Sequence, residues 1–114
     1  MRIAPGCLAL GAGFVAGACV LASSSGALGA GNARTHEIVI QGLQYQPETL
    51  RVRRGDVVVW INKDPFPHTA TAPKVFDSGS IVADGSWRFT ATRAGVHPYI
   101  CTLHPNMKGT LQVE

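Results

Sequence analysis

The sequence predicts an all-β domain in residues 34–114, folded as a two-sheet Greek-key β-sandwich of seven or eight strands. After Ala33, short runs rich in valine, isoleucine, threonine and aromatic residues alternate with glycine, proline, asparagine and aspartate, a pattern typical of strands and turns. No stretch sustains a helical period. Because no connection is long enough to hold a crossover helix, a sandwich fits better than a parallel α/β arrangement.

Eight candidate strands follow one another along this domain. Alternation is clearest after Gly85, where Trp87, Phe89 and Ala91 are separated by polar or charged residues, so we expect these three side chains to face the core. Glycine-containing turn signals precede residues 56, 86 and 96. The expected strands are residues 37–42, 49–53, 56–62, 69–72, 80–82, 86–92, 96–101 and 109–114.

Residues 1–30 read as a secretory signal peptide. Arg2 is followed by no charged residue before Arg34, and residues 7–22 are rich in alanine, glycine, leucine and valine. Small residues offer several cleavage positions within 27–33. Two alternatives stay open: an uncleaved membrane anchor, although glycine and serine make this segment a poor span, and a lipid-modified Cys19. We expect a periplasmic or otherwise exported protein that meets a membrane only if the leader is retained.

Cysteine usage points to metal binding. Of the three cysteines, Cys7 and Cys19 fall in the leader, so the mature chain keeps Cys101 alone and can form no internal disulfide. A domain of roughly 80 residues has a marginal core, and a bound metal often stabilises it. A single cysteine in an exported protein pairs with another chain, is a reactive thiol, or binds a metal.

The charge of the chain is mild. Nine of its ten lysine and arginine residues and all seven acidic residues follow Ala33, and the whole chain has a formal net charge of +3. Nucleic-acid binding requires a dense basic stripe, so we expect no nucleic-acid partner.

Cys101, His104 and Met107 set a thiol, an imidazole and a thioether three residues apart. A helix would rotate them apart by about 60° at each step, and Pro105 lacks the amide proton that a helix requires. A tight loop between two strands would instead direct all three side chains to one point. This pattern predicts a metal site.

His68 is the best candidate for a fourth ligand, because it lies in a proline-bounded loop after a predicted strand. Two imidazoles, one thiolate and one thioether form a soft donor set that selects copper, and a weak axial methionine is typical of electron-transfer copper sites. Structural zinc prefers another cysteine, histidine or carboxylate to methionine. Haem is disfavoured because C-x-x-C-H is absent.

A series of motifs runs along residues 36–114: Trp60-Ile61-Asn62, Pro67-His68, Gly95, Tyr99, Cys101-Thr102, His104-Pro105, Met107 and Gly109-Thr110-Leu111. In these motifs and their order, residues 36–114 resemble the cupredoxins. The two-residue gap between His104 and Met107 most resembles the amicyanins, since plastocyanins and pseudoazurins have a longer gap. The resemblance implies one copper ion, alternating between Cu(I) and Cu(II), held by His68, Cys101 and His104, with Met107 as the axial ligand.

The family pattern also implies supporting hydrogen bonds. Asn62 is similar to an asparagine that ties the ligand loops together through the residue after the cysteine, here Thr102, and the amide of Thr69 would donate to the Cys101 sulfur. His97 departs from the family, which tends to have an aromatic residue there. Four residues of strand place His97 about 13 Å from Cys101, so it cannot bind the same copper.

The resemblance implies a monomeric electron shuttle and not an enzyme. Multicopper oxidases require histidines flanking the cysteine, whereas Cys101 lies between Ile100 and Thr102. Expected partners are redox proteins such as a c-type cytochrome or a periplasmic dehydrogenase. The alternative function is a periplasmic copper carrier or storage protein. Electrons would leave through His104, where the expected docking residues are Phe66, Pro67, Leu103 and Pro105.

Overall fold

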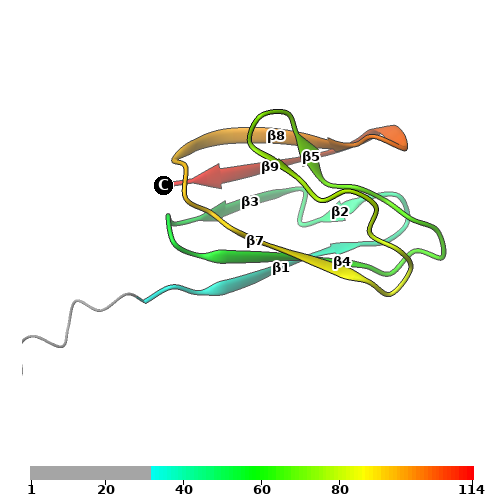
Figure 1. Ribbon diagram of the computed structural model, residues 1–114, viewed down its shortest axis with the longest axis horizontal. Helices are drawn as coiled ribbons and strands as arrows, with labels where there is room; N and C mark the ends of the chain where they lie inside the picture. Colours follow the sequence, from blue (N-terminus) through cyan, green and yellow to red (C-terminus); the bar gives the residue numbers. More distant parts are fainter. Residues whose placement is uncertain (1–31) are drawn as a thin grey trace, which may run out of the picture. The chain divides into compact units, whose positions relative to one another are not determined.

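The computed structural model describes residues 32–114, so the expected signal peptide, its cleavage positions before residue 32 and Cys19 lie outside the described residues. Residues Ala33–Glu114 form one compact unit. Within the described residues, nine strands make two sheets and confirm the predicted all-β class (Figure 1). No helix in this part of the chain is long and apolar enough to cross a bilayer.

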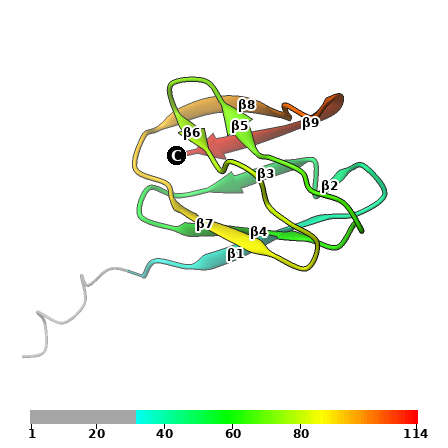
Figure 2. The ribbon, with the colours of Figure 1, turned by 45° about the vertical axis from the view of Figure 1, so that its right-hand side comes forward.

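The two sheets form the layers of a sandwich, seen from two directions in Figures 1 and 2. The four-stranded sheet has the order β2 (Tyr45–Gln46), β1 (Thr35–Ile40), β4 (Val57–Asn62) and β7 (Ser86–Thr90). The five-stranded sheet has the order β3 (Thr49–Val52), β9 (His104–Val113), β8 (Gly95–Cys101), β5 (Thr71–Ala72) and β6 (Phe76–Asp77). Both sheets are mixed, because β1 pairs with β4 and β3 pairs with β9 in parallel register.

Aromatic side chains fill the space between the sheets. The fully buried Trp60 of β4 has the rings of Phe76, Trp87 and Tyr99 at centroid distances of 5.3, 5.4 and 5.6 Å. Trp87 and Phe89 are half-buried while the residues between and beside them on β7 are exposed, as the alternation predicted. The core thus joins both sheets and provides a stiff base for the loops at their ends.

Three details of the predicted strands were wrong. Residues 80–82 are not a strand: only Ile81 forms a bridge, which pairs it with His68. The two-residue strands β2 and β6 were missed, because such short strands carry no alternation to detect. Strand β9 begins at His104 and not near residue 109, because Cys101 and His104 pair across a turn of two residues.

The metal-ligand candidates lie at one end of the sandwich. Strand β8 and strand β9 meet there in the orange-to-red turn at the right of Figure 1, whereas the C-terminus lies at the opposite end. The hydrogen bonds between the backbones of His68 and Ile81 attach the loop after β4 to this same end. Short connections from two sheets therefore converge on one point.

Asp56 connects the beginning of β1 to the beginning of β4 through side-chain hydrogen bonds. Its carboxylate accepts hydrogen bonds from the amides of Arg34 (3.0 Å) and Arg53 (3.1 Å) and pairs with His36 Nε2 (2.9 Å). The Arg34 amide, then His36 and the Arg53 amide, lower the pKa of Asp56 from 3.8 to about 2. The ionised carboxylate is therefore the form that the folded state prefers.

We expect Asp56→Asn to lower the melting temperature at neutral pH. Because the folded pKa is depressed, the contribution of Asp56 is complete above the ordinary value of 3.8 and is lost as the pH falls through about 2. Thermal unfolding followed by circular dichroism at a series of pH values measures the effect. Asp84→Asn, at an exposed position, is the control; an equal pH dependence in both variants would contradict this role for Asp56.

Candidate metal centre

Cys101 is directed inward by the pleat of β8. His97, Tyr99 and Cys101 alternate with more exposed residues along this strand, and Cys101 has no exposed surface. The amide of Thr69 donates a hydrogen bond to Cys101 Sγ at 3.3 Å, the contact expected from the sequence. The thiol group is thus fixed by the strand on one side and by the residue after His68 on the other.

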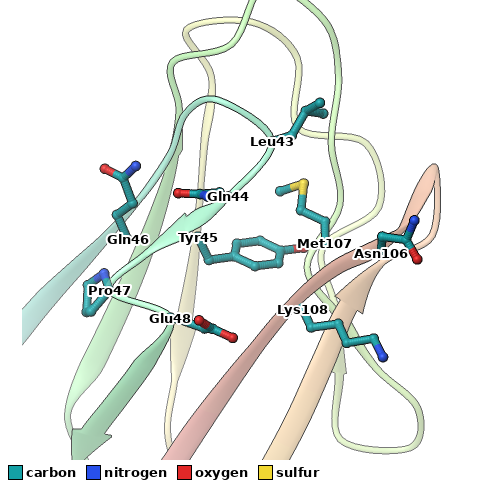
Figure 3. Close-up of a pocket in the computed structure, with 9 residues that line it drawn as sticks. All are labelled: Leu43, Gln44, Tyr45, Gln46, Pro47, Glu48, Asn106, Met107 and Lys108. Atoms are coloured by element: carbon teal, nitrogen blue, oxygen red, sulfur yellow. The ribbon is translucent and has the colours of Figure 1, made fainter.

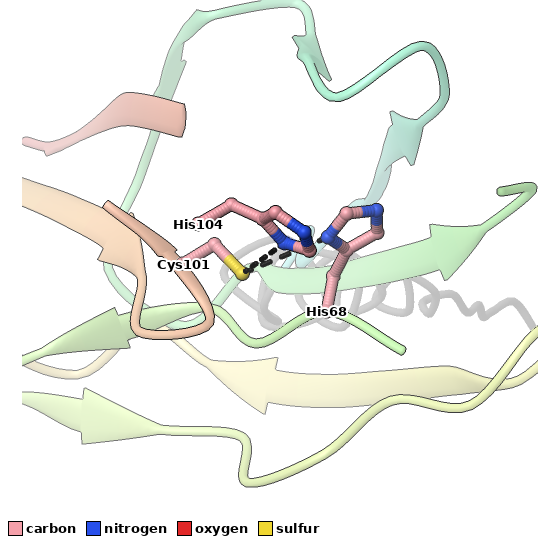
Figure 4. Close-up of side chains that lie close together, drawn as sticks. All are labelled: His68, Cys101 and His104. Carbon is pink, nitrogen blue, oxygen red and sulfur yellow. Dashed lines mark hydrogen bonds between the residues drawn. The ribbon is translucent and has the colours of Figure 1, made fainter. Parts of the chain in front are cut away.

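Three donor atoms converge at this end of the sandwich. Cys101 Sγ lies 3.6 Å from His68 Nδ1 and 3.8 Å from His104 Nδ1, as Figure 4 shows. Among the described residues, these three form the group of histidine, cysteine and carboxylate side chains placed to hold a metal, with ligand atoms within 4.8 Å of one another. His68 and Cys101 are buried, and His104 is half-buried.

These separations fit a metal ion between the donors. With metal–sulfur and metal–nitrogen bonds of about 2.3 and 2.0 Å, bond angles of about 110–120° place sulfur and nitrogen roughly 3.5–3.7 Å apart. The Cys101 sulfur and the Nδ1 atoms of His68 and His104 lie at nearly these distances. The site is therefore already arranged for a tetrahedral or trigonal metal.

Met107 lies on β9, three residues beyond His104, and its side chain is buried. It lines a pocket of about 530 Å³ between residues 43–48 and residues 106–108, where the ring of Tyr45 points toward it (Figure 3). A second pocket borders Met107 together with Leu103 and His104. Met107 therefore shares a pocket with His104, one of the three clustered residues.

Thr69, rather than Asn62, ties the two ligand loops together. Thr69 Oγ1 accepts a hydrogen bond from the amide of Thr102 (2.9 Å) and lies 3.2 Å from Thr102 Oγ1. The expected contact between Asn62 and Thr102 is wrong. The Asn62 amide group instead donates to the carbonyls of Phe66 (2.9 Å) and Ile81 (2.8 Å), so it joins the loop that carries His68 to the segment around Ile81.

We expect Thr69→Val to destabilise the folded domain by about 1–2 kcal/mol, because the Thr102 amide would lose its acceptor while the shape of the side chain is kept. Chemical denaturation of the metal-free protein measures the loss. Thr90→Val on the exposed face of β7 is the control. Equal stability of the two variants would show that the Thr69 hydroxyl does not link the loops.

Asp64 is a site residue that was missed in the sequence. It is buried, and its Oδ2 lies 2.7 Å from His68 Nε2, the ring nitrogen that faces away from Cys101. Burial raises the pKa of Asp64, but hydrogen bonds from the amides of Leu43 and Gly42 and from His68 outweigh it, so the pKa lies below its ordinary value. A carboxylate four residues before a ligand histidine was the available signal.

His97 takes no part in the cluster found among the described residues. Its Nε2 donates a hydrogen bond to the carbonyl of Arg93 at 2.9 Å, across the turn before β8. The ring also covers Gly95, where a Cβ would lie 3.4 Å from the His97 ring. This histidine therefore closes the turn before β8.

An apolar rim surrounds the half-buried His104. The ring of Phe66 lies 5.7 Å from the ring of His104. Leu43 (46% exposed), Leu103 (52%) and Pro105 line a pocket together with His104, and Phe66 is 40% exposed. Pro67, the neighbour of Phe66 in the chain, is exposed as well. Leu43 was not among the docking residues expected from the sequence. The apolar patch thus contains residues from three loops, with the imidazole of His104 among them.

Together, the sandwich and its end site define a small β-protein that holds one metal through imidazole and thiolate groups. Residues 12–113 match the sequence profile of the Cupredoxin-like domain. The chain belongs to the cupredoxin family, and its donor set is that of a type 1 copper site.

Within this family, individual relatives that match the chain are amicyanins. Amicyanin of Paracoccus denitrificans is 31% identical over 81 residues, which cover 66% of this chain and 62% of that protein. Amicyanin-alpha of Methylorubrum extorquens is 29% identical over 116 positions, covering 94% of this chain and 98% of its relative. The chain thus spans less than two thirds of the Paracoccus protein and nearly all of the Methylorubrum one.

Solved structures agree with this resemblance. An amicyanin variant in the Cu(I) form superimposes with a TM-score of 0.65 at 30% identity, covering 77% of this chain and 88% of the other. A copper-containing nitrite reductase from Thermus scotoductus gives a TM-score of 0.66 at 26% identity, but the match covers only 22% of that longer chain. The unit shared with both structures is therefore the two-sheet sandwich.

Proposed function

We propose that this protein is an exported type 1 copper protein that shuttles single electrons between redox partners. The observation that carries the proposal is the convergence of Cys101 Sγ, His68 Nδ1 and His104 Nδ1 within 4.8 Å at one end of a cupredoxin sandwich. Copper bound there would supply a one-electron couple between Cu(I) and Cu(II).

In this proposal His68 and His104 bind through Nδ1, Cys101 binds through its thiolate, and Met107 provides the weak axial sulfur. The burial of Met107 beside the cluster supports its role. Hydrogen bonds to the Cys101 sulfur and between Thr69 and Thr102 hold the donors in place without the metal. Such a rigid arrangement favours electron transfer, because little has to move when the charge changes.

The surroundings of His104 support electron exit through its imidazole. Its ring is half-buried and the rim around it is apolar, which suits brief docking over a small interface. The relatives matched along most of this chain are amicyanins, which are electron carriers and not enzymes. We propose a c-type cytochrome or a periplasmic dehydrogenase as the kind of partner, and a monomer as the working form.

Export is the second part of the proposal. The uncharged segment between Arg2 and Arg34 supports a signal peptide over residues 1–30 with cleavage within 27–33. Expression of the full chain in a Gram-negative host, followed by fractionation and mass spectrometry, tests it. We expect periplasmic protein that begins within or just after that window; membrane-bound protein of full length would contradict cleavage.

Electron counting separates the shuttle from a copper carrier or store. The protein, purified after expression of the full chain and loaded with Cu(II), is reduced by ascorbate and reoxidised by ferricyanide in the presence of a Cu(I) chelator. We expect one electron per chain over repeated cycles with the copper retained. Loss of copper to the chelator on the first reduction would instead support the carrier.

A further inference from the structure

Asp64 has an unusual number of partners for a buried carboxylate. Oδ1 accepts a hydrogen bond from the amide of Gly42 at 2.7 Å, and Oδ2 accepts one from the amide of Leu43 at 3.0 Å. Oδ2 also accepts the hydrogen bond from His68 Nε2 at 2.7 Å. The backbone amide of Asp64 donates to Asn62 Oδ1 at 2.9 Å, which fixes the residue itself. The carboxylate is thus held from several sides.

The two amides belong to a turn that has a strained residue. Gly42 and Leu43 both have positive φ, 65° and 59°, between strands β1 and β2. Leucine rarely adopts this conformation, because its Cβ then comes too close to the following carbonyl oxygen. Successive amides in such a turn point to one side and form a concave anion site, which here contains the carboxylate of Asp64.

The strained turn places an apolar side chain at the metal centre. Leu43 lines the pocket that borders Met107 and Tyr45, and it also lines the pocket that borders His104 and Met107. Figure 3 shows the Leu43 side chain and the thioether of Met107 in the first of these pockets. The backbone conformation of Leu43 therefore sets where this apolar side chain lies beside Met107 and His104.

We propose that Asp64 is a positioning residue that fixes two parts of the copper site at once, the imidazole of His68 and the Leu43 side chain beside Met107. This inference rests on the proposed copper function. Because an acceptor faces Nε2, the hydrogen of His68 is held on Nε2 and the lone pair of Nδ1 is directed toward Cys101. A single side chain thereby joins the β1–β2 turn to the loop after β4.

The carboxylate also affects the balance between the two copper states. A hydrogen bond to a carboxylate raises the basicity of a ligand imidazole. Cu(II) gains more from a basic ligand than Cu(I) does, because its charge is larger. Asp64 is therefore expected to stabilise the oxidised state and to lower the reduction potential.

Asp64→Asn tests this role by removing the charge with little change of shape. The carboxamide can accept from only some of its three donors, and its own N–H₂ would face another donor. We expect copper affinity to fall about tenfold. We expect the Cu(I)/Cu(II) equilibrium to shift about tenfold toward Cu(I), which is a rise of ~59 mV for one electron.

Asp84→Asn is the matched control, since Asp84 is exposed and forms no side-chain hydrogen bond among those found in residues 32–114. Voltammetry of the copper proteins and competition with a chelator give the potential and the affinity. An Asp64→Asn protein that behaves as the Asp84→Asn protein does would overturn the inference, while a wild-type protein that forms no one-copper site would overturn the proposed function instead.

Nuclear magnetic resonance of the wild-type Cu(I) protein tests the inference without any variant, in case Asp64→Asn does not fold. We expect the Nε2 hydrogen of His68 to exchange slowly with water and that of the half-buried His104 to exchange fast. We also expect the amides of Gly42 and Leu43 to be protected, although both residues are exposed. Fast exchange of these two amides and of the His68 hydrogen would overturn the inference.

Leu43→Gly tests the second half of the proposal. Glycine accepts the positive φ and keeps the amide that donates to Asp64, so only the side chain next to Met107 is lost. We expect a protein with its His68 Nε2 hydrogen still protected that releases copper to a chelator faster than wild type. Release at the wild-type rate would show that Leu43 does not cover the site.

Discussion

Cys101→Ser is expected to abolish the intense visible colour of the copper protein and to weaken copper binding by more than about 100-fold, the upper end of what outer-shell partners contribute. The sulfur atom is the soft, charged donor that selects copper. Serine has nearly the same shape, and its oxygen could still accept the hydrogen bond from the Thr69 amide. The metal-free variant should therefore remain folded while the colour is lost.

His97→Asn serves as the control for Cys101→Ser. His97 lies on the same strand and is buried, yet it bonds to the Arg93 carbonyl and lies outside the cluster found in residues 32–114. We expect its copper form to stay coloured. A coloured Cys101→Ser protein, measured by absorption after addition of one equivalent of Cu(II), would contradict the role of the thiolate.

Gly109→Ala is expected to destabilise the domain by about 3 kcal/mol, at the upper end of the usual cost of overpacking a core. A Cβ at Gly109 would clash with Tyr99 Cζ and would lie 2.5 Å from the hydroxyl oxygen of Tyr99. Tyr99 cannot withdraw easily, because its buried ring packs edge-on against Tyr45 at 4.6 Å and against Trp60 at 5.6 Å. Chemical denaturation of the metal-free protein measures the change.

Gly79→Ala is the control for Gly109→Ala, because it introduces backbone strain without a steric clash. Gly79 has a φ of +66° but open space around its Cβ position, so alanine there meets strain alone and should cost about 1–2 kcal/mol. Gly109 has the clash and no positive φ. Equal stability of the Gly79→Ala and Gly109→Ala proteins would show that the close approach of Tyr99 is not the reason for glycine at position 109.

Much of the site could be predicted because its residues are close in sequence. Cys101, His104 and Met107 lie close together at the end of β8 and the beginning of β9, so spacing and donor chemistry alone indicate a soft metal site. His68 was harder to predict as a ligand, because it lies in a loop 33 residues before Cys101 in the chain. The all-β class was predictable for a similar reason, because the alternation on β7 and the glycine-containing turn signals are local features of the sequence.

The parts of the site and of the fold that could not be predicted depend on contacts between segments far apart in the sequence. Asp64 accepts hydrogen bonds from a turn more than twenty residues earlier in the chain, and no local pattern shows that this turn lies beside the metal loops. Asn62 and Thr69 both have hydrogen-bonding side chains near His68, so which of them reaches Thr102 depends on how the loop folds. The strands β2 and β6 exist only through their neighbours in the sheets.

A titration with Cu(II) under oxidising conditions tests the central claim most directly, namely that His68, Cys101, His104 and Met107 form one type 1 copper site. The absorption and electron paramagnetic resonance spectra of the protein are recorded as copper is added. We predict an intense blue band that grows to one equivalent of copper and then stops, with a single Cu(II) signal. Copper that binds without a blue band, or a band that needs more than one ion per chain, would contradict the claim.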